Sequence, residues 1–145
     1  MMIDPVQAAG ETTSIGLPAV QVPLTAATDR PLTQDDVTTI SKLEPGSALL
    51  VSTRGASTGS RYLLDTDQVT VGRDPRADIL LDDSTVSRQH AHFHRVNGGY
   101  EIEDDGSLNG TYVNMQRIED RQLLHNGDSL MIGRFRMMYF TSPQA

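Results

Sequence analysis

The feature that most constrains the fold is a succession of short apolar runs, rich in β-branched and aromatic residues, between Ser47 and Thr141. Turn residues such as Asp74-Pro75, Asn97-Gly98-Gly99 and Asn126-Gly127 separate most of these runs. This pattern is typical of β-strands joined by tight turns and leaves no room for crossover helices. The sequence therefore predicts an all-β domain, an antiparallel β-sandwich. The ten expected strands cover residues 48–52, 61–64, 69–71, 79–81, 91–96, 100–103, 111–113, 123–124, 129–132 and 135–141.

Residues 1–45 differ in composition from the rest of the chain. They are rich in Thr, Ala, Pro, Gln and Asp, contain no aromatic residue, and space their apolar residues without a lasting period. Such a segment buries too little apolar surface to offset the entropy lost on folding. The sequence therefore predicts a flexible N-terminal tail over residues 1–45 and a folded domain over residues 46–145.

One stretch of this tail has a helical pattern. Thr33 is a suitable N-cap residue, and Asp36 stands at the third helical position, where its carboxylate can complete the cap. Val37, Ile40 and Leu43 follow at roughly helical spacing. A short helix is expected here, as an exception within the tail.

The whole-chain composition excludes several classes of protein. The chain has no cysteine, so no disulfide, thiol nucleophile or cysteine-based zinc site is expected. No apolar run is long enough to span a membrane and no secretory signal is recognisable, which predicts a cytoplasmic location. A net charge of -7 argues against duplex nucleic acid or an acidic membrane as the main partner. Any anion site must therefore be local.

The cations of the predicted domain are all arginines. Residues 46–145 contain ten Arg and no Lys, against thirteen Asp and Glu. The planar guanidinium suits bidentate contact with oxyanions, so this usage fits a phosphate or carboxylate site. The use of arginine alone is explained equally well by a general preference for arginine over lysine in the lineage from which the protein comes.

Three polar clusters fall in the gaps between the expected strands. They are Gly72-Arg73, Ser87-Arg88-Gln89-His90, and Ser107-Leu108-Asn109-Gly110-Thr111 with Asn114 just beyond. A phosphothreonine carries about -1.5 to -2 charges and three acceptor oxygens, so its reader needs a fixed cation and neutral donors. Arg73, Arg88, Ser87 and Asn109 supply these groups from separate loops. Each residue alone is better explained as a solvated loop residue, and only the set indicates an anion site.

In order and spacing, these clusters resemble the signature of the forkhead-associated (FHA) domain over residues 46–141. The resemblance implies a β-sandwich of about eleven strands whose loops at one end bind phosphothreonine. It implies that Arg73 and Ser87 contact the phosphate with Arg88 beside them, and that Asn109 holds the peptide backbone. Ser107 and Leu108 are then close to the ligand. Leu108 stands where the family often has Thr, which removes one possible hydroxyl contact. The residues expected to support the loops are Gly72, His90, Gly110, Thr111 and Asn114.

The tail contains a candidate ligand for such a site. Thr12 and Thr13 form a hydroxyl pair after Glu11 and before Ser14-Ile15, and either threonine is a candidate phosphorylation site. About 33 residues separate Thr13 from the predicted domain, which gives a flexible chain a reach of about 30 Å. The tail could therefore occupy its own domain's loops, and phosphorylation would mask the site.

Tail and domain together resemble the actinobacterial 2-oxoglutarate dehydrogenase inhibitors, also called glycogen accumulation regulators. The resemblance implies a monomeric, cofactor-free regulator that is not an enzyme. Its unphosphorylated form would inhibit the E1 component of 2-oxoglutarate dehydrogenase and modulate glutamate dehydrogenase and glutamate synthase. Serine/threonine protein kinases would then switch it off through the tail. Gln89, where these relatives more often have Arg, and Gly16-Leu17-Pro18 depart from the pattern.

Two alternatives remain open at the level of sequence. The first is an adaptor that binds phosphothreonine on other proteins and carries an inert tail. The second is a small β-fold metalloenzyme, because His90, His92 and His94 alternate and would place three imidazoles on one strand face about 7 Å apart. The acidic pairs Asp82-Asp83 and Asp104-Asp105 coincide with turn signals and are interpreted as turn caps.

Overall fold

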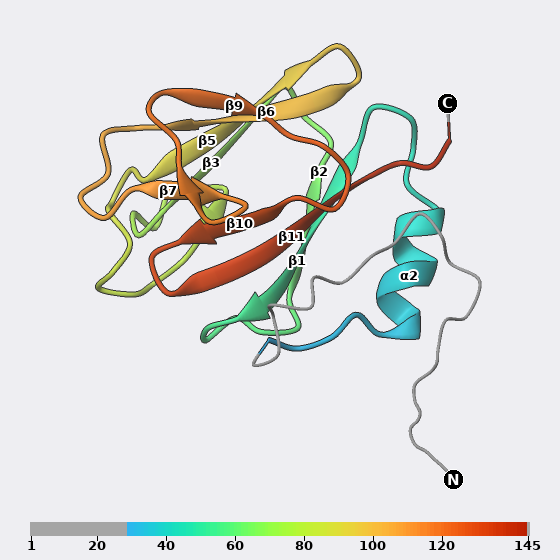
Figure 1. Cartoon of the computed structure of the whole chain (residues 1–145), viewed down its shortest axis with the longest axis horizontal. Coiled ribbons are helices and arrows are strands. Elements are labelled where there is room, and N and C mark those ends of the chain that lie inside the picture. Colours follow the sequence, from blue (N-terminus) through green and yellow to red (C-terminus); the bar gives the residue numbers. More distant parts are fainter. Residues whose placement is uncertain (1–28, 145) are drawn as a thin grey trace, which may run out of the picture.

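The protein forms a sandwich of two β-sheets with one short helix outside it, as seen in a computed structural model that describes residues 29–144 (Figure 1). One sheet has six strands in the order β2-β1-β11-β10-β7-β8, and the other has five in the order β4-β3-β5-β6-β9. The elements are α2 (Gln34–Ser41), β1 (Ala48–Arg54), β2 (Arg61–Leu64), β3 (Gln68–Gly72), β4 (Ile79–Leu80), β5 (Ala91–Val96), β6 (Gly99–Asp104), β7 (Thr111–Val113), β8 (Gln116–Arg117), β9 (Arg121–Leu123), β10 (Ser129–Ile132) and β11 (Phe135–Thr141).

The predicted all-β sandwich is confirmed, and each of the ten expected runs overlaps a strand. One strand, β8, was not among the ten predicted runs, because Gln116 and Arg117 are polar and exposed and show no apolar alternation. One pairing also departs from the antiparallel expectation, since β3 and β4 run parallel, with Val71 opposite Ile79. The loop between these two strands carries Arg73, one of the candidate site residues.

The main core lies between the two sheets. It is built from alternate side chains of most of the strands, and the largest of its fully buried members are Tyr100, Tyr139, Phe93, Leu50 and Leu64. All residues of β11 from Phe135 to Phe140 are buried, so both faces of this strand are covered. The reason is a second apolar cluster on the outer face of the six-stranded sheet.

Helix α2 covers this second cluster. Thr33 accepts a hydrogen bond from the Asp36 N–H at 3.1 Å, and the Asp36 carboxylate accepts one from the Thr33 N–H at 2.9 Å, which completes the expected capping box. Ile40 and Leu43 then pack against an apolar patch of β1 and β11, formed by Leu49, Val51, Met138 and Phe140.

The segment from Asp29 to Pro45 is therefore folded onto the sandwich, which corrects its prediction as flexible tail. The composition of residues 1–45 concealed this because few apolar residues suffice when the sheet supplies the rest of the cluster. The first 28 residues, including Thr12 and Thr13, lie outside the described part of the chain.

Two buried carboxylates join this segment to the sheet. Asp36 pairs with Arg30 at 2.9 Å and with Arg61 at 2.7 Å. Asp29 pairs with Arg54 at 2.7 Å and with Arg136 at 3.4 Å. Burial opposes the ionisation of Asp36, but the Thr33 N–H and the two guanidinium groups outweigh it, so the pKa of Asp36 lies below its usual value. Some of the arginines thus serve the fold rather than a ligand.

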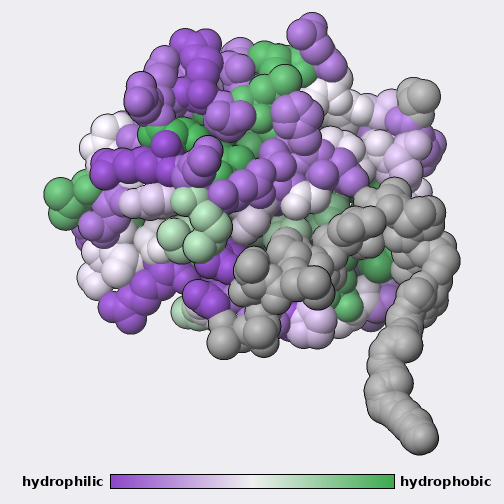
Figure 2. All heavy atoms as spheres, viewed as in Figure 1, coloured by the Kyte–Doolittle hydropathy of each residue, from purple (hydrophilic) through white to green (hydrophobic). Residues whose placement is uncertain are grey.

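The face of the molecule drawn in Figure 2 is mostly polar. Figure 2 shows hydrophilic side chains over most of the visible face, with hydrophobic ones in small patches between them. Within residues 29–144 no helix is long and apolar enough to cross a membrane.

Candidate functional site

The three polar clusters meet at one end of the sandwich, on the left in Figure 1. The loops that carry them join β3 to β4, β4 to β5, and β6 to β7. A fourth loop, between β10 and β11, lies at the same end. It contacts the β4–β5 loop, where the Arg134 N–H donates to the Thr85 hydroxyl at 3.0 Å. Residues as far apart in the chain as Gly72 and Arg134 are thereby brought into one surface.

Backbone contact at Gly72 holds the first two loops together. The Arg73 N–H donates to the Ser87 carbonyl at 3.0 Å, and the Asp74 N–H donates to the Arg88 carbonyl at 3.1 Å. A Cβ atom on Gly72 would lie 2.0 Å from the Arg88 carbonyl oxygen, a distance that no side chain can tolerate. Glycine is required here because of this close approach.

His90 joins the second loop to the third. Its ring is fully buried, and Nδ1 accepts a hydrogen bond from the Ser87 N–H at 3.0 Å while Nε2 lies 2.9 Å from the Gly110 carbonyl. A backbone N–H can only donate and a carbonyl can only accept, so the proton of the neutral ring is on Nε2. His90 therefore fixes Ser87 and Gly110 in position with both ring nitrogens.

Asp104 caps the turn at the start of the third loop, which confirms its interpretation as a turn cap. Its carboxylate accepts hydrogen bonds from the Ser107 hydroxyl at 2.5 Å, the Thr111 hydroxyl at 2.8 Å, and the N–H groups of Gly106 and Ser107. Burial raises the pKa of Asp104, but these donors outweigh it, so the pKa lies below its usual value. The Asp-x-Gly-Ser spacing is the turn signal behind that prediction, whereas the contact with the Thr111 hydroxyl was not predicted.

These contacts among the loops leave several side-chain N–H and O–H donors directed to solvent. The Arg73 Nε–H donates to the Val86 carbonyl at 3.0 Å, and no described residue accepts from its two terminal nitrogens. The Ser87 hydroxyl oxygen accepts from the Leu108 N–H at 3.0 Å, which leaves its own proton available. The Arg88 side chain is 61% exposed and lies 3.7 Å from the Asp74 carboxylate. Fixed, unshared N–H and O–H donors of this kind suit an oxyanion.

Asn109, Leu108 and Asn114 occupy different places. Asn109 is exposed at the tip of the third loop, and its side-chain NH₂ donates to the Thr85 carbonyl at 2.9 Å. Leu108 is 85% exposed beside it. Asn114 lies after β7 and binds Asp128 and Ser129, so it supports the adjoining turn rather than the three clustered loops.

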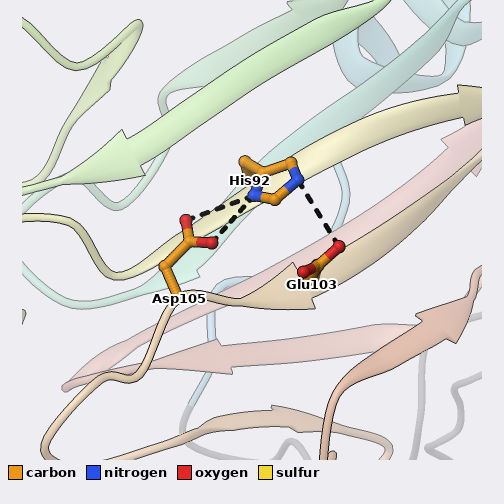
Figure 3. Close-up of side chains that lie close together, drawn as sticks. All are labelled: His92, Glu103 and Asp105. Carbon is orange, nitrogen blue, oxygen red and sulfur yellow. Dashed lines mark hydrogen bonds and ion pairs between the residues drawn. The ribbon is translucent and has the colours of Figure 1, made fainter.

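The histidine row proposed for a metal site is not formed. His90 precedes β5, and its ring is buried among the loops. His92 instead lies between two carboxylates, with Nδ1 at 3.0 Å from Asp105 and Nε2 at 3.7 Å from Glu103. Figure 3 shows Asp105 beside one ring nitrogen and Glu103 beside the other, and one ligand atom from each of the three residues lies within 4.8 Å of the other two, so this trio, and not the histidine row, has the spacing of a possible ion site.

Comparison with known proteins gives this site its family. The FHA domain model matches residues 69–133. The glycogen accumulation regulator GarA of Mycobacterium tuberculosis is 49% identical over 112 residues, which cover 77% of this chain and 68% of GarA. The chain belongs to the FHA domain family.

Further relatives and solved structures agree with this assignment. The oxoglutarate dehydrogenase inhibitor of Corynebacterium glutamicum is 50% identical over 101 residues, 70% of each chain. The M. tuberculosis EmbR structure, solved with a low-affinity phosphopeptide, matches 68% of this chain and 25% of EmbR, with a TM-score of 0.62 and 30% identity. An FHA domain from a study of phosphothreonine-dependent interactions matches 67% of this chain and 98% of its own, with a TM-score of 0.60 and 27% identity.

The named relatives are regulators and inhibitors, and their shared FHA domain is a binding module. This FHA protein is accordingly a regulatory binding protein rather than an enzyme, and the metalloenzyme alternative loses its support.

Proposed function

We propose that the clustered loops of this FHA domain bind phosphothreonine. Arg73 and the Ser87 hydroxyl would contact the phosphate, with Arg88 beside them and Asn109 on the peptide backbone. Ser107 and Leu108 would contribute through the loop that Asp104 caps. The observation that carries the proposal is the set of free donors on Arg73 and Ser87, fixed in position by Gly72 and His90.

Replacing Arg73 with alanine is expected to weaken phosphothreonine-peptide binding about 100-fold, because a charge-assisted contact with a phosphate is lost. Fluorescence anisotropy with a labelled phosphopeptide measures the effect. Arg121→Ala is the matched control, since Arg121 is an exposed arginine of β9 that pairs only with Glu101 and Asp120 among the described residues. Equal affinities for the two variants would contradict the assignment of Arg73.

We further propose that the chain is a phosphorylation-controlled regulator. Relatives about half identical to it are named glycogen accumulation regulator and oxoglutarate dehydrogenase inhibitor. In this proposal the unphosphorylated protein inhibits the E1 component of 2-oxoglutarate dehydrogenase and modulates glutamate dehydrogenase and glutamate synthase. Serine/threonine kinases phosphorylate Thr12 or Thr13, and the domain then binds its own tail. A cytoplasmic monomer suits this role.

The folded segment that begins at Asp29 strengthens the case for self-recognition. Asp29 is held by Arg54 and Arg136, so only residues 14–28 separate Thr13 from an anchored position. A flexible chain of about 15 residues has a reach of about 20 Å, against a radius of gyration of about 13 Å for a domain of about 100 residues. The effective concentration of the tail would be on the order of millimolar.

Phosphorylation of Thr12 or Thr13 is therefore expected to close the molecule. In NMR spectra the amide signals of Ser87 and Asn109 should shift on phosphorylation in the wild type, with little change in Arg73→Ala. Dilution should not reverse the shift, because the contact is intramolecular. Unchanged loop signals in the phosphorylated wild type would refute closure while leaving phosphopeptide binding in trans intact.

The adaptor function is the second candidate. It is favoured by the solved FHA domain of FhaA, which matches this fold with a TM-score of 0.57 and 26% identity and was crystallised with the intracellular domain of another protein. Removing residues 1–28 separates the two candidates. For an adaptor with an inert tail, phosphopeptide affinity is the same with the tail phosphorylated, unphosphorylated or absent. For a self-recognising regulator, only the phosphorylated tail blocks the peptide.

A further inference from the structure

Arg117 stands beside the third recognition loop without a partner of its own. It is an exposed residue of β8, the edge strand of the six-stranded sheet, and is paired in register with Tyr112 of β7. Within residues 29–144 no hydrogen bond or ion pair engages its guanidinium group. Of the two acids that follow it, Asp120 pairs with Arg121 at 3.7 Å, and Glu119 forms no ion pair with Arg117.

The side chain of Arg117 lies against the Asn109-Gly110 turn. A Cβ atom on Gly110 would be 2.6 Å from Arg117 Nε and 2.9 Å from Cζ, so the guanidinium group occupies the space that the missing side chain leaves. Gly110 also has a φ of +85°, which favours glycine independently. The turn thus gives Arg117 a surface against which its planar group is held, with its charge exposed to solvent.

This position brings a cation within reach of a bound peptide. Consecutive Cα atoms are about 3.8 Å apart, so the guanidinium group lies within about 8 Å of the Asn109 Cα atom. An extended peptide advances about 3.3 to 3.6 Å per residue. The Ser87 hydroxyl, the proposed phosphate contact, lies 3.0 Å from the Leu108 N–H, next to Asn109. A peptide with its phosphate at Ser87 would therefore present a side chain about two or three positions from its phosphothreonine to Arg117.

The other arginine flanking the site is differently placed. Arg134 lies on the Thr85 side, and its Nε is 3.7 Å from the Asp83 carboxylate, which offsets part of its charge. Arg117 is on the Asn109–Gly110 side and is not offset. The two flanks of the site therefore differ in their attraction for an anion.

We propose that Arg117 is a specificity-determining residue that selects phosphothreonine peptides with an anionic group two or three residues from the phosphothreonine. This inference rests on the proposed phosphothreonine recognition. The anion is a carboxylate side chain or a second phosphate. In the chain's own tail, Glu11 stands two positions before Thr13 and is a ligand of this kind.

The test is a set of phosphothreonine peptides with neutral flanks, each carrying one Asp at a position from three before to three after the phosphothreonine. One further peptide carries a second phosphothreonine at the position where Asp tightens binding most. Affinities are measured with the full chain, the Arg117→Gln variant, and the Arg134→Gln variant as matched control. At one or two positions Asp should tighten binding to the wild type about threefold to fivefold, an effect that high salt removes.

In Arg117→Gln this gain should vanish while affinity for the neutral peptide is unchanged, and Arg134→Gln should retain it. Arg117→Lys should restore part of the gain, and Arg117→Glu should favour Lys over Asp at the same positions. A uniform loss of affinity for all peptides in Arg117→Gln, or retention of the gain, would overturn the role of Arg117. Failure of the wild type to bind even the neutral phosphopeptide would overturn phosphothreonine recognition as well.

Discussion

Replacing Gly72 with alanine is expected to lower the free energy of unfolding by about 3 to 5 kcal/mol, since the clash is with backbone and not with a flexible side chain. The new Cβ atom would lie 2.0 Å from the Arg88 carbonyl oxygen and 2.9 Å from its carbon. Relieving this clash requires the β3–β4 and β4–β5 loops to separate, which breaks the hydrogen bonds of Arg73 and Asp74 to Ser87 and Arg88. Phosphopeptide affinity should fall with them.

Urea denaturation and thermal melting measure this effect, with a decrease in Tm of roughly 15 to 30 °C expected for a domain of this size. Gly99→Ala is the matched control, because a Cβ atom at Gly99 meets its nearest neighbour, the Tyr139 hydroxyl, at 3.7 Å. That variant should lose little stability. If Gly72→Ala had the same Tm and the same phosphopeptide affinity as the wild type, the close approach of these loops would not be the reason why glycine is needed at this position.

Replacing Asp36 with alanine is the second large effect, with an expected loss of about 2 to 4 kcal/mol. The substitution removes half of the capping box and leaves Arg30 and Arg61 without their shared carboxylate. Asp35→Ala is the matched control, since Asp35 is exposed in the same helical turn. Denaturation followed by far-UV circular dichroism compares the two, and similar stabilities would show that the buried carboxylate contributes nothing.

The same carboxylate predicts a dependence of stability on pH. The pKa of Asp36 is lowered in the folded protein, so its contribution is present above the unfolded-state pKa of about 3.9 and is lost as pH falls through the folded value. Asp104 has a lowered pKa and acts in the same direction. The wild type should therefore lose stability below about pH 4, and Asp36→Asn should lose less over that range. An equal slope for the two proteins would exclude Asp36 as a contributor.

Retention of α2 on the sheet also bears on the proposed switch. Asp29 and Asp36 together hold residues 29–45 against the six-stranded sheet through three of its arginines, Arg54, Arg61 and Arg136. The part of the chain available for self-recognition is therefore shorter than composition suggested. Weakening the contacts of Asp29 should therefore lengthen the stretch between Thr13 and its anchored position and lower the effective concentration of the proposed phosphothreonine at the loops.

Much of the fold could be predicted because its signals are local. Alternation of side chains along a strand and turn pairs such as Asn126-Gly127 act over two to six residues, so ten of the strands were located from the sequence. The capping box of Thr33 and Asp36 spans four residues and was recognisable for the same reason. Strand β8 was missed because two exposed polar residues are held only by their pairing with β7.

By itself the sequence determined the strand succession, the turn positions, the capping box and which loops carry the donors. Only the tertiary structure decided that Gly72 meets the Arg88 carbonyl, that Asp29 and Asp36 find their arginines, and that Arg117 lies on the Gly110 turn. These contacts depend on sheet order and register, which place residues from separate strands and loops within a few ångströms. The recognition loops first inferred from three short clusters are thus completed by groups that lie outside the clusters: Asp104 beneath the third loop and Arg117 at its side.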